Sequence, residues 1–172
     1  MLPQEKKQNN KQVTLPISRL FPNIITIMAI CFAFTSIRFA LNEQWDMATY
    51  FIIVAGILDM LDGRIARLLK ATSDFGAQLD SLADFANFGV APAIVLYLWN
   101  MHHIELKGLG WSLALFYTIC QAIRLARFNS DLVDPDRPEW KNGFFTGIPA
   151  PAGAYLAVMP IMLSFKTDII DH

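Results

Sequence analysis

The stretch Asp59-Met-Leu-Asp62-Gly63-Arg-Ile-Ala66-Arg67, followed after eight intervening residues by Gly76-Ala-Gln-Leu-Asp80-Ser-Leu-Ala-Asp84, sets four carboxylates into a sequence that is otherwise apolar. A charged side chain inside a membrane costs about 2.5 to 3.5 kcal/mol even on the insertion scale, so such groups need a cation or a wet cavity. The stretch therefore predicts a metal-dependent site at a membrane surface.

Apolar residues around this stretch form long runs and make up 54% of the 172 residues. Several of these runs approach the roughly 20 residues that a spanning helix needs. They cover 20–41, 47–61, 85–101, 109–123 and 144–165. The prediction is an all-α, polytopic membrane helix bundle with about five spans, which excludes an ordinary soluble domain.

Basic residues are unevenly distributed, although the formal net charge is only -1. They collect before the first run, after the second and around the end of the fourth, at Lys6, Lys7, Lys11, Arg19, Arg64, Arg67, Lys70, Arg124, Arg127, Arg137 and Lys141. The positive-inside rule then predicts a cytoplasmic N-terminus. Both halves of the opening stretch would lie near the cytoplasmic face.

Three regions are predicted along the chain. Residues 1–12 read as a disordered polar tail, and residues 13–21, with Pro16 inside the segment and Pro22 just after it, as a segment lying along the membrane interface. Residues 22–165 form the membrane domain.

The second helix should continue past its apolar part, which ends at Asp59, and project beyond the hydrocarbon as far as about Leu69. Ser73 or Asp74 is placed to cap the third helix, and Pro92 predicts a kink within it.

Helical periodicity of 100° per residue gathers the polar residues of the opening stretch onto two faces. An arc of about 140° on the second helix holds Asp59, Asp62, Gly63, Ala66 and Arg67. An arc of about 80° on the third helix holds Gly76, Asp80, Asp84 and Asn87. If the two faces oppose each other, the four carboxylates converge on one pocket.

Clustered carboxylates repel one another, and hard oxygen ligands are those that Mg²⁺, Mn²⁺ or Ca²⁺ prefer. Two such ions can stabilise the attacking and leaving oxygens of a phosphoryl displacement. Gly63 and Gly76, with the small Ala66, leave room for a phosphate ester beside the backbone, and Arg67 can bind diphosphate oxygens as a planar fork. For any single residue, a charge capping a helix end is the better interpretation. For the eight positions together, a functional site is the better interpretation.

The spacing D-x2-D-G-x2-A-R-x8-G-x3-D-x3-D resembles the signature of the CDP-alcohol phosphatidyltransferase family, and every motif residue is present. The segments 79–93, 123–129 and 145–152 are similar to the serine-using branch, the bacterial and archaeal CDP-diacylglycerol–serine O-phosphatidyltransferases. The similarity extends from about Leu20 to Ala157.

The resemblance implies transfer of the phosphatidyl group from CDP-diacylglycerol to the hydroxyl of L-serine, giving phosphatidylserine and CMP. It implies two divalent cations, Mg²⁺ or Mn²⁺, and assigns Asp84 as the base. The metal ligands that it implies are Asp59, Asp62, Asp80 and Asp84. The CDP part would be held by Gly63, Ala66, Arg67 and Gly76.

Five further polar residues are candidates for ligand contacts. Asn23 and Thr26, at the start of the first span, could contact the CDP-lipid or simply cap the helix. Arg124 and Arg127 could bind the serine carboxylate or act as positive-inside anchors, and Asn87, on the same face as Asp84, is a third candidate for binding the acceptor.

The resemblance also implies a multi-pass protein of the cell (inner) membrane, a cytoplasmic active site, contact with membrane lipid and a homodimer. No nucleic acid partner is expected. Because that family has a six-span core, the expectation is a C-terminally incomplete domain. Another acceptor, such as glycerol 3-phosphate, is an alternative, and a noncatalytic divalent-cation-binding or transport protein is a more distant one.

Overall fold

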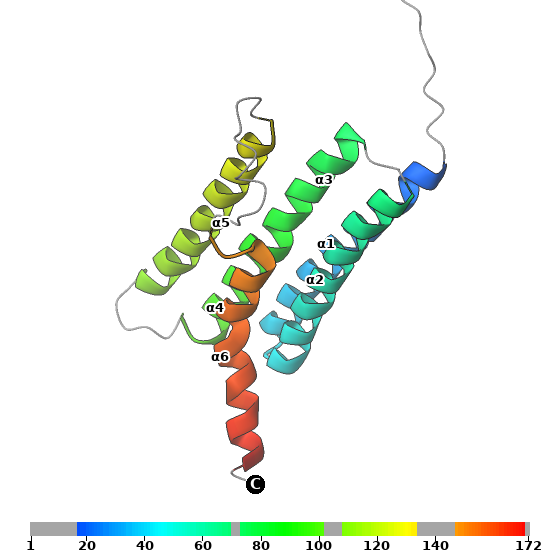
Figure 1. Cartoon of the computed structure of the whole chain (residues 1–172). Helices are drawn as coiled ribbons and strands as arrows, with labels where there is room; N and C mark the ends of the chain where they lie inside the picture. The colour runs from blue at the N-terminus through cyan, green and yellow to red at the C-terminus, as the bar shows by residue number, and fades with distance from the viewer. Residues whose placement is uncertain (1–16, 70–72, 102–107, 134–146, 171–172) are drawn as a thin grey trace, which may run out of the picture.

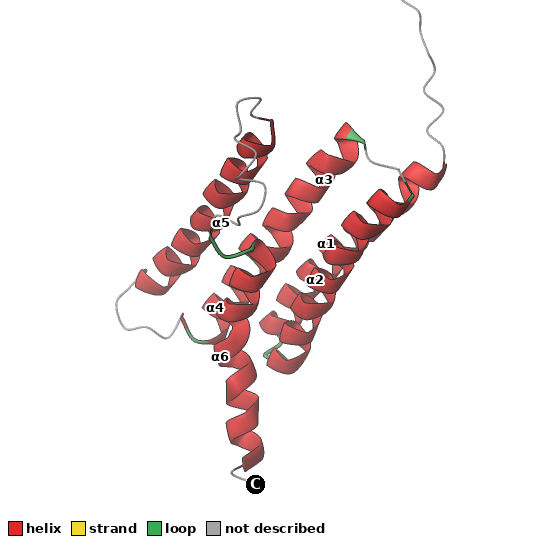
Figure 2. Cartoon of the chain, in the orientation of Figure 1, coloured by secondary structure: helices red, strands yellow, loops and turns green. Residues whose placement is uncertain are grey.

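The computed structural model describes residues 17–69, 73–101, 108–133 and 147–170, and within these residues every regular element is helical (Figure 2). The elements are α1 (Ile17–Leu41), α2 (Trp45–Leu68), α3 (Asp74–Asp84), the π-helix η1 (Phe85–Val90), α4 (Ala91–Trp99), α5 (Leu109–Val133) and α6 (Ala150–Ile170). The predicted all-α class is confirmed. The predicted tail, residues 1–12, lies outside the described residues.

A central rod organises the bundle, because α3, η1 and α4 follow one another without a break. Figure 1 shows this rod between α5 on one side and the α1–α2 pair on the other. The two helices α1 and α2 pack along each other over most of their length, and α6 packs on α2, η1 and α4. The ends of α2 and α3 that bear the carboxylates therefore face each other beside α1.

Three helical segments are long and apolar enough to cross a membrane, namely Phe21–Leu41, Asp74–Trp99 and Leu109–Asp131. A shorter apolar helix covers Ala150–Ser164. The α2 helix is of spanning length, but its second half contains charged residues at Asp59, Asp62, Arg64 and Arg67. The chain is thus an integral membrane protein with several spanning helices, while the count of five spans and the cytoplasmic N-terminus stay predictions.

The helix boundaries test several predictions directly. The α2 helix continues through its polar end to Leu68, as expected. Ser73 caps α3, because its hydroxyl accepts a hydrogen bond of 3.0 Å from the backbone N–H of Gly76. The first helix begins at Ile17, so residues 17–21 of the segment expected at the interface are continuous with α1.

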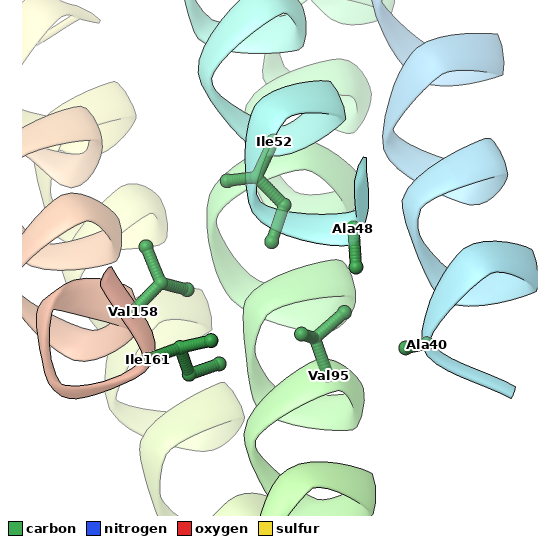
Figure 3. Close-up of a cluster of buried hydrophobic side chains, with 6 residues drawn as sticks. All are labelled: Ala40, Ala48, Ile52, Val95, Val158 and Ile161. Atoms are coloured by element: carbon green, nitrogen blue, oxygen red, sulfur yellow. The ribbon is translucent and has the colours of Figure 1, made fainter. Parts of the chain in front are cut away.

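The interior of the bundle is built largely from small residues, which let helix backbones approach closely where lipid supplies no hydrophobic drive for helix association. Figure 3 shows one buried cluster, in which α1, α2, α4 and α6 contribute Ala40, Ala48, Ile52, Val95, Val158 and Ile161. Large apolar side chains such as Phe34, Tyr50 and Phe116 are exposed instead. The bundle is therefore apolar on the surface that faces lipid.

Gly56 permits a close helix contact on α2. A Cβ atom there would overlap the hydroxyl of Tyr155 on α6 and lie 3.2 Å from a ring carbon of Phe88. A methyl group at this position would force the side chains of Tyr155 and Phe88 to shift, and packed interiors have little space to absorb such a shift.

We expect Gly56→Ala to lower the stability of the bundle by about 1 to 3 kcal/mol, the usual cost of overpacking. The melting temperature of the purified protein in detergent measures this. The matched control is Gly63→Ala on the same helix, where an added Cβ would meet nothing within 4 Å. Equal melting temperatures for the two variants would contradict the packing interpretation.

Candidate functional site

Four carboxylates come together where α2 and α3 face each other. Asp59 and Asp62 lie on α2, and Asp80 and Asp84 lie on α3. The charge of Asp59 interacts with those of all three others, most strongly with Asp84. The neighbouring faces of α2 and α3 thus bring together four carboxylates that are up to 25 residues apart in the sequence.

Asp62 is the most enclosed of the four, with only 2% of its surface exposed. Among the described residues, neither of its carboxylate oxygens has a hydrogen-bond partner. The hydroxyl of the neighbouring Thr26 donates to the Pro22 carbonyl at 3.1 Å, within its own helix. A buried, unpaired carboxylate is costly, so Asp62 is poised for a cation.

The four side chains do not form a closed cage as they stand. Within the ranges that the structure describes, no three His, Cys, Asp or Glu side chains are close enough together to hold one metal ion. Asp80 is exposed and lines a pocket between α1, α2 and α3, whereas Asp59 and Asp84 are partly buried.

A pocket of about 300 Å³ opens between α1, α2 and α3. Its lining comes from all three helices and consists of Pro22, Asn23, Thr26, Asp62, Gly63, Ala66, Arg67, Ser73, Gly76, Ala77 and Asp80. All six residues expected to contact a CDP-lipid line this pocket, together with two of the four motif carboxylates. One face of the pocket is therefore anionic, and Arg67 contributes a cation to its wall.

The two motif glycines differ in what surrounds them. At Gly63 an added Cβ would meet nothing within 4 Å, so the missing side chain leaves space that belongs to the pocket. At Gly76 it would lie 3.1 Å from the Ser73 hydroxyl and 3.2 Å from the Asn23 side-chain oxygen. Gly76 thus lets α3 begin close against α1, whereas Gly63 leaves room for a ligand.

Arg67 lies one turn after Gly63 on the exposed side of α2. Its Nε donates to the Gly63 carbonyl at 3.1 Å, which holds the side chain along its own helix. An arginine has five N–H donors, and this bond uses one of them. The guanidinium retains donors for an anionic ligand at the pocket wall.

The three residues expected to bind the acceptor are placed differently from one another. Asn87 is fully buried and donates from Nδ2 to Asp59 Oδ1 at 3.1 Å, from η1 to α2. Arg124 on α5 is half-buried, its Nε has no partner among the described residues, and its charge reaches Asp84. Arg127 is exposed.

Tyr117 on α5 received no role from the sequence, yet its hydroxyl donates to the Phe88 carbonyl at 2.8 Å. The sequence feature that could have indicated this contact is Pro92, for which only a kink in the helix was predicted. A proline has no N–H, so the carbonyl four residues earlier loses its helical partner and must find another donor. The helix that contains Pro92 adopts a π turn just before it, rather than a simple bend.

Comparisons with known proteins agree with this site. A sequence model of the CDP-alcohol phosphatidyltransferase family matches residues 19–171. A protein of Mycobacterium leprae named CDP-diacylglycerol–serine O-phosphatidyltransferase is 46% identical over 148 residues, which are 86% of this chain and 48% of that protein. Proteins of the same name are 39% identical in Helicobacter pylori (88% of this chain, 61% of the relative) and 36% identical in Bacillus subtilis (85% and 81%).

The chain spans about half the length of the mycobacterial relatives that it matches. The family match itself covers nearly every residue of the chain and includes the whole D-x2-D-G-x2-A-R-x8-G-x3-D-x3-D stretch around the pocket. With a match of this extent, the chain belongs to the CDP-alcohol phosphatidyltransferase family.

Proposed function

We propose that the protein containing this chain transfers the phosphatidyl group of CDP-diacylglycerol to the hydroxyl of L-serine, giving phosphatidylserine and CMP. The observation that carries the proposal is the pocket between α1, α2 and α3, because it gathers the motif glycines, Arg67 and two motif carboxylates around one space. The names of the relatives support serine as the acceptor.

The donor set fits divalent cations. Asp62 has two buried oxygens without partners among the described residues, and Asp59 lies within reach of three other negative charges. Carboxylate oxygens are the ligands that Mg²⁺ and Mn²⁺ prefer. We assign Asp59, Asp62, Asp80 and Asp84 as the ligands of two such ions, which when bound would neutralise charge on the phosphate oxygens.

The CDP part of the donor lipid would occupy the pocket. Gly63 and Ala66 leave space beside the α2 backbone, and Arg67 offers N–H donors to diphosphate oxygens. Asn23 and Thr26 line the opposite wall on α1, and Gly76 closes the pocket on α3. The acyl chains would extend into lipid past the exposed apolar surface of the bundle.

The reaction that we propose is a single displacement. The serine hydroxyl oxygen attacks the phosphorus that bears diacylglycerol, the bond from this phosphorus to the bridging oxygen breaks, and CMP leaves with that electron pair. Asp84 takes the hydroxyl proton as the new bond forms. We assign Arg124 to the serine carboxylate, and the support is that its charge reaches Asp84, the proposed base.

Positive residues near the site favour the cytoplasmic side of the cell membrane for this chemistry. The donor lipid is supplied from the membrane, and CMP is released to water on that side.

The first test is turnover by the full-length gene product in membranes. Supplied with CDP-diacylglycerol, labelled serine and Mn²⁺ or Mg²⁺, it should form phosphatidylserine and CMP. Asp84→Asn should lose roughly 10²- to 10⁴-fold in rate, because that is the usual contribution of a positioned base. Asp74→Asn, on the exposed first turn of the same helix, is the control and should retain turnover. Preference for glycerol 3-phosphate over serine in the same assay would reject serine as the acceptor.

The second test concerns the metal ligands and needs no turnover. Mn²⁺ should raise the melting temperature of the protein, because a ligand at one hundred times its Kd adds about 2.7 kcal/mol of stability. Asp62→Asn removes a buried unpaired charge, so this variant should be at least as stable without metal but should respond much less to Mn²⁺. Asp46→Asn, an exposed change on α2, is the control. An undiminished Mn²⁺ response in Asp62→Asn would remove Asp62 from the metal site.

The third test concerns the nucleotide pocket. Gly63→Ala should raise the KM for CDP-diacylglycerol about tenfold, because about 1.4 kcal/mol of overpacking in the pocket weakens binding by that factor. The melting temperature should not fall, because alanine favours a helix more than glycine does. The KM for serine should not change, since outside its own helix backbone the new methyl group would meet no protein atom within 4 Å. An unchanged KM for the lipid would place the CDP part elsewhere.

A further inference from the structure

The rod formed by α3, η1 and α4 changes its winding immediately after Asp84. Residues Phe85–Val90 form a π-helix, in which the Ala91 N–H donates to the Ala86 carbonyl five residues earlier. Short π segments inside α-helices are rare and are frequent at functional sites. The motif carboxylates of α3 therefore stand directly before a widened turn.

The widened turn has a chemical cause and a partner that holds it. Pro92 offers no N–H to the carbonyls behind it. The Phe88 carbonyl instead accepts the Tyr117 hydroxyl at 2.8 Å. The Thr118 hydroxyl lies 3.3 Å from the Gly89 carbonyl but also 3.0 Å from the Ala114 carbonyl of its own helix, so it shares one proton between the two. In a membrane a freed carbonyl must find such a donor, because no water is available.

The Tyr117 hydroxyl is itself fixed from a second side. Gln121 Nε2 donates to its oxygen at 3.2 Å, so the hydroxyl proton is left for the Phe88 carbonyl. Helix α5 packs mainly against η1 and α4. It thus contacts the rod at the residues where the winding changes.

Asn87 lies in the middle of this turn and is fully buried. Its Nδ2 donates to Asp59 Oδ1 at 3.1 Å, which joins η1 to the first motif carboxylate on α2. The amide is neutral, so it fixes one oxygen of Asp59 without cancelling the negative charge that a cation requires. A lysine or arginine at the same place would compete with that cation.

We propose that Asn87 is a positioning residue that orients Asp59 for divalent-cation binding, and that the Tyr117 hydroxyl maintains Asn87 in place by stabilising the π turn. The proposal rests on the metal site of the proposed function. Hydrogen-bond partners of metal ligands typically contribute 10- to 100-fold to metal affinity or activity. Asn87 thereby acts through Asp59 rather than on the acceptor.

The decisive measurement is the Mn²⁺ affinity of the full-length protein, followed by the electron paramagnetic resonance signal of free Mn²⁺. Asn87→Leu keeps the size of the side chain but removes the donor, and should weaken Mn²⁺ binding about 10- to 100-fold. At saturating Mn²⁺, much of the rate of phosphatidyl transfer should return, because the ion then orients Asp59.

The matched control is Asn129→Leu. Asn129 Nδ2 donates to the Ser81 hydroxyl at 3.0 Å, so this variant also removes an amide hydrogen bond between helices, α5 to α3, without touching Asp59. It should leave Mn²⁺ affinity within about twofold of the unmodified protein, since a bond between neutral groups typically contributes only about 1 kcal/mol and Ser81, although next to Asp80, is not itself a proposed ligand. Equal losses of affinity in the two variants would reduce Asn87 to a packing role and overturn the proposal.

Tyr117→Phe tests the second step without altering Asn87 itself. Loss of the hydroxyl should weaken Mn²⁺ binding severalfold, and less than Asn87→Leu does, because the effect passes through the backbone of η1. Tyr50→Phe, which removes a hydroxyl from an exposed position, is the control. Wild-type Mn²⁺ affinity in Tyr117→Phe would reject the role of the π turn.

Failure of this inference is distinguishable from failure of the proposed function. If the unmodified protein binds Mn²⁺ and forms phosphatidylserine but Asn87→Leu binds Mn²⁺ equally well, only the positioning role is wrong. If the unmodified protein shows neither Mn²⁺ binding nor turnover, the proposed metal site is wrong and the inference falls with it.

Discussion

Mutual repulsion of the four carboxylates on α2 and α3 is the constraint on which this bundle depends. The charge of Asp59 interacts with those of the other three, and Asp62 is buried with both oxygens unpaired among the described residues. Outside water such a set is unfavourable without cations. The fold therefore keeps together charges that would be easier to separate, which is expected where the protein's own stability is secondary to binding a ligand.

Close helix packing makes this convergence possible. Gly76 brings the start of α3 against Asn23 of α1, and Gly56 lets α6 approach α2 at Tyr155. The interior alanines have the same effect along the length of the bundle. In lipid, where apolar side chains gain little from leaving their surroundings, close van der Waals contact between backbones is what holds such helices together.

The π turn at Phe85–Val90 connects the packing of the bundle to its site. Helix α5 supplies the Tyr117 hydroxyl to the Phe88 carbonyl within this turn, and the same turn places Asn87 against Asp59. Helix α5 lies on the far side of the rod from α2 (Figure 1). It is thus linked to Asp59 through the Tyr117–Phe88 hydrogen bond, the π turn and the Asn87–Asp59 hydrogen bond. Membrane proteins tolerate such irregular backbone only where neighbouring side chains replace the missing bonds.

The sequence by itself determined the all-α membrane class, the extension of α2 past its apolar part, a cap at Ser73 or Asp74, and the grouping of motif residues on two helix faces. These follow from apolar run length and from a 3.6-residue period, which are local properties. Only the tertiary structure decided that Gly63 opens into a pocket while Gly76 permits a helix contact. It also decided that Asn87 reaches Asp59. These outcomes depend on which helices become neighbours and on a π turn, and neither can be predicted from a regular 3.6-residue period.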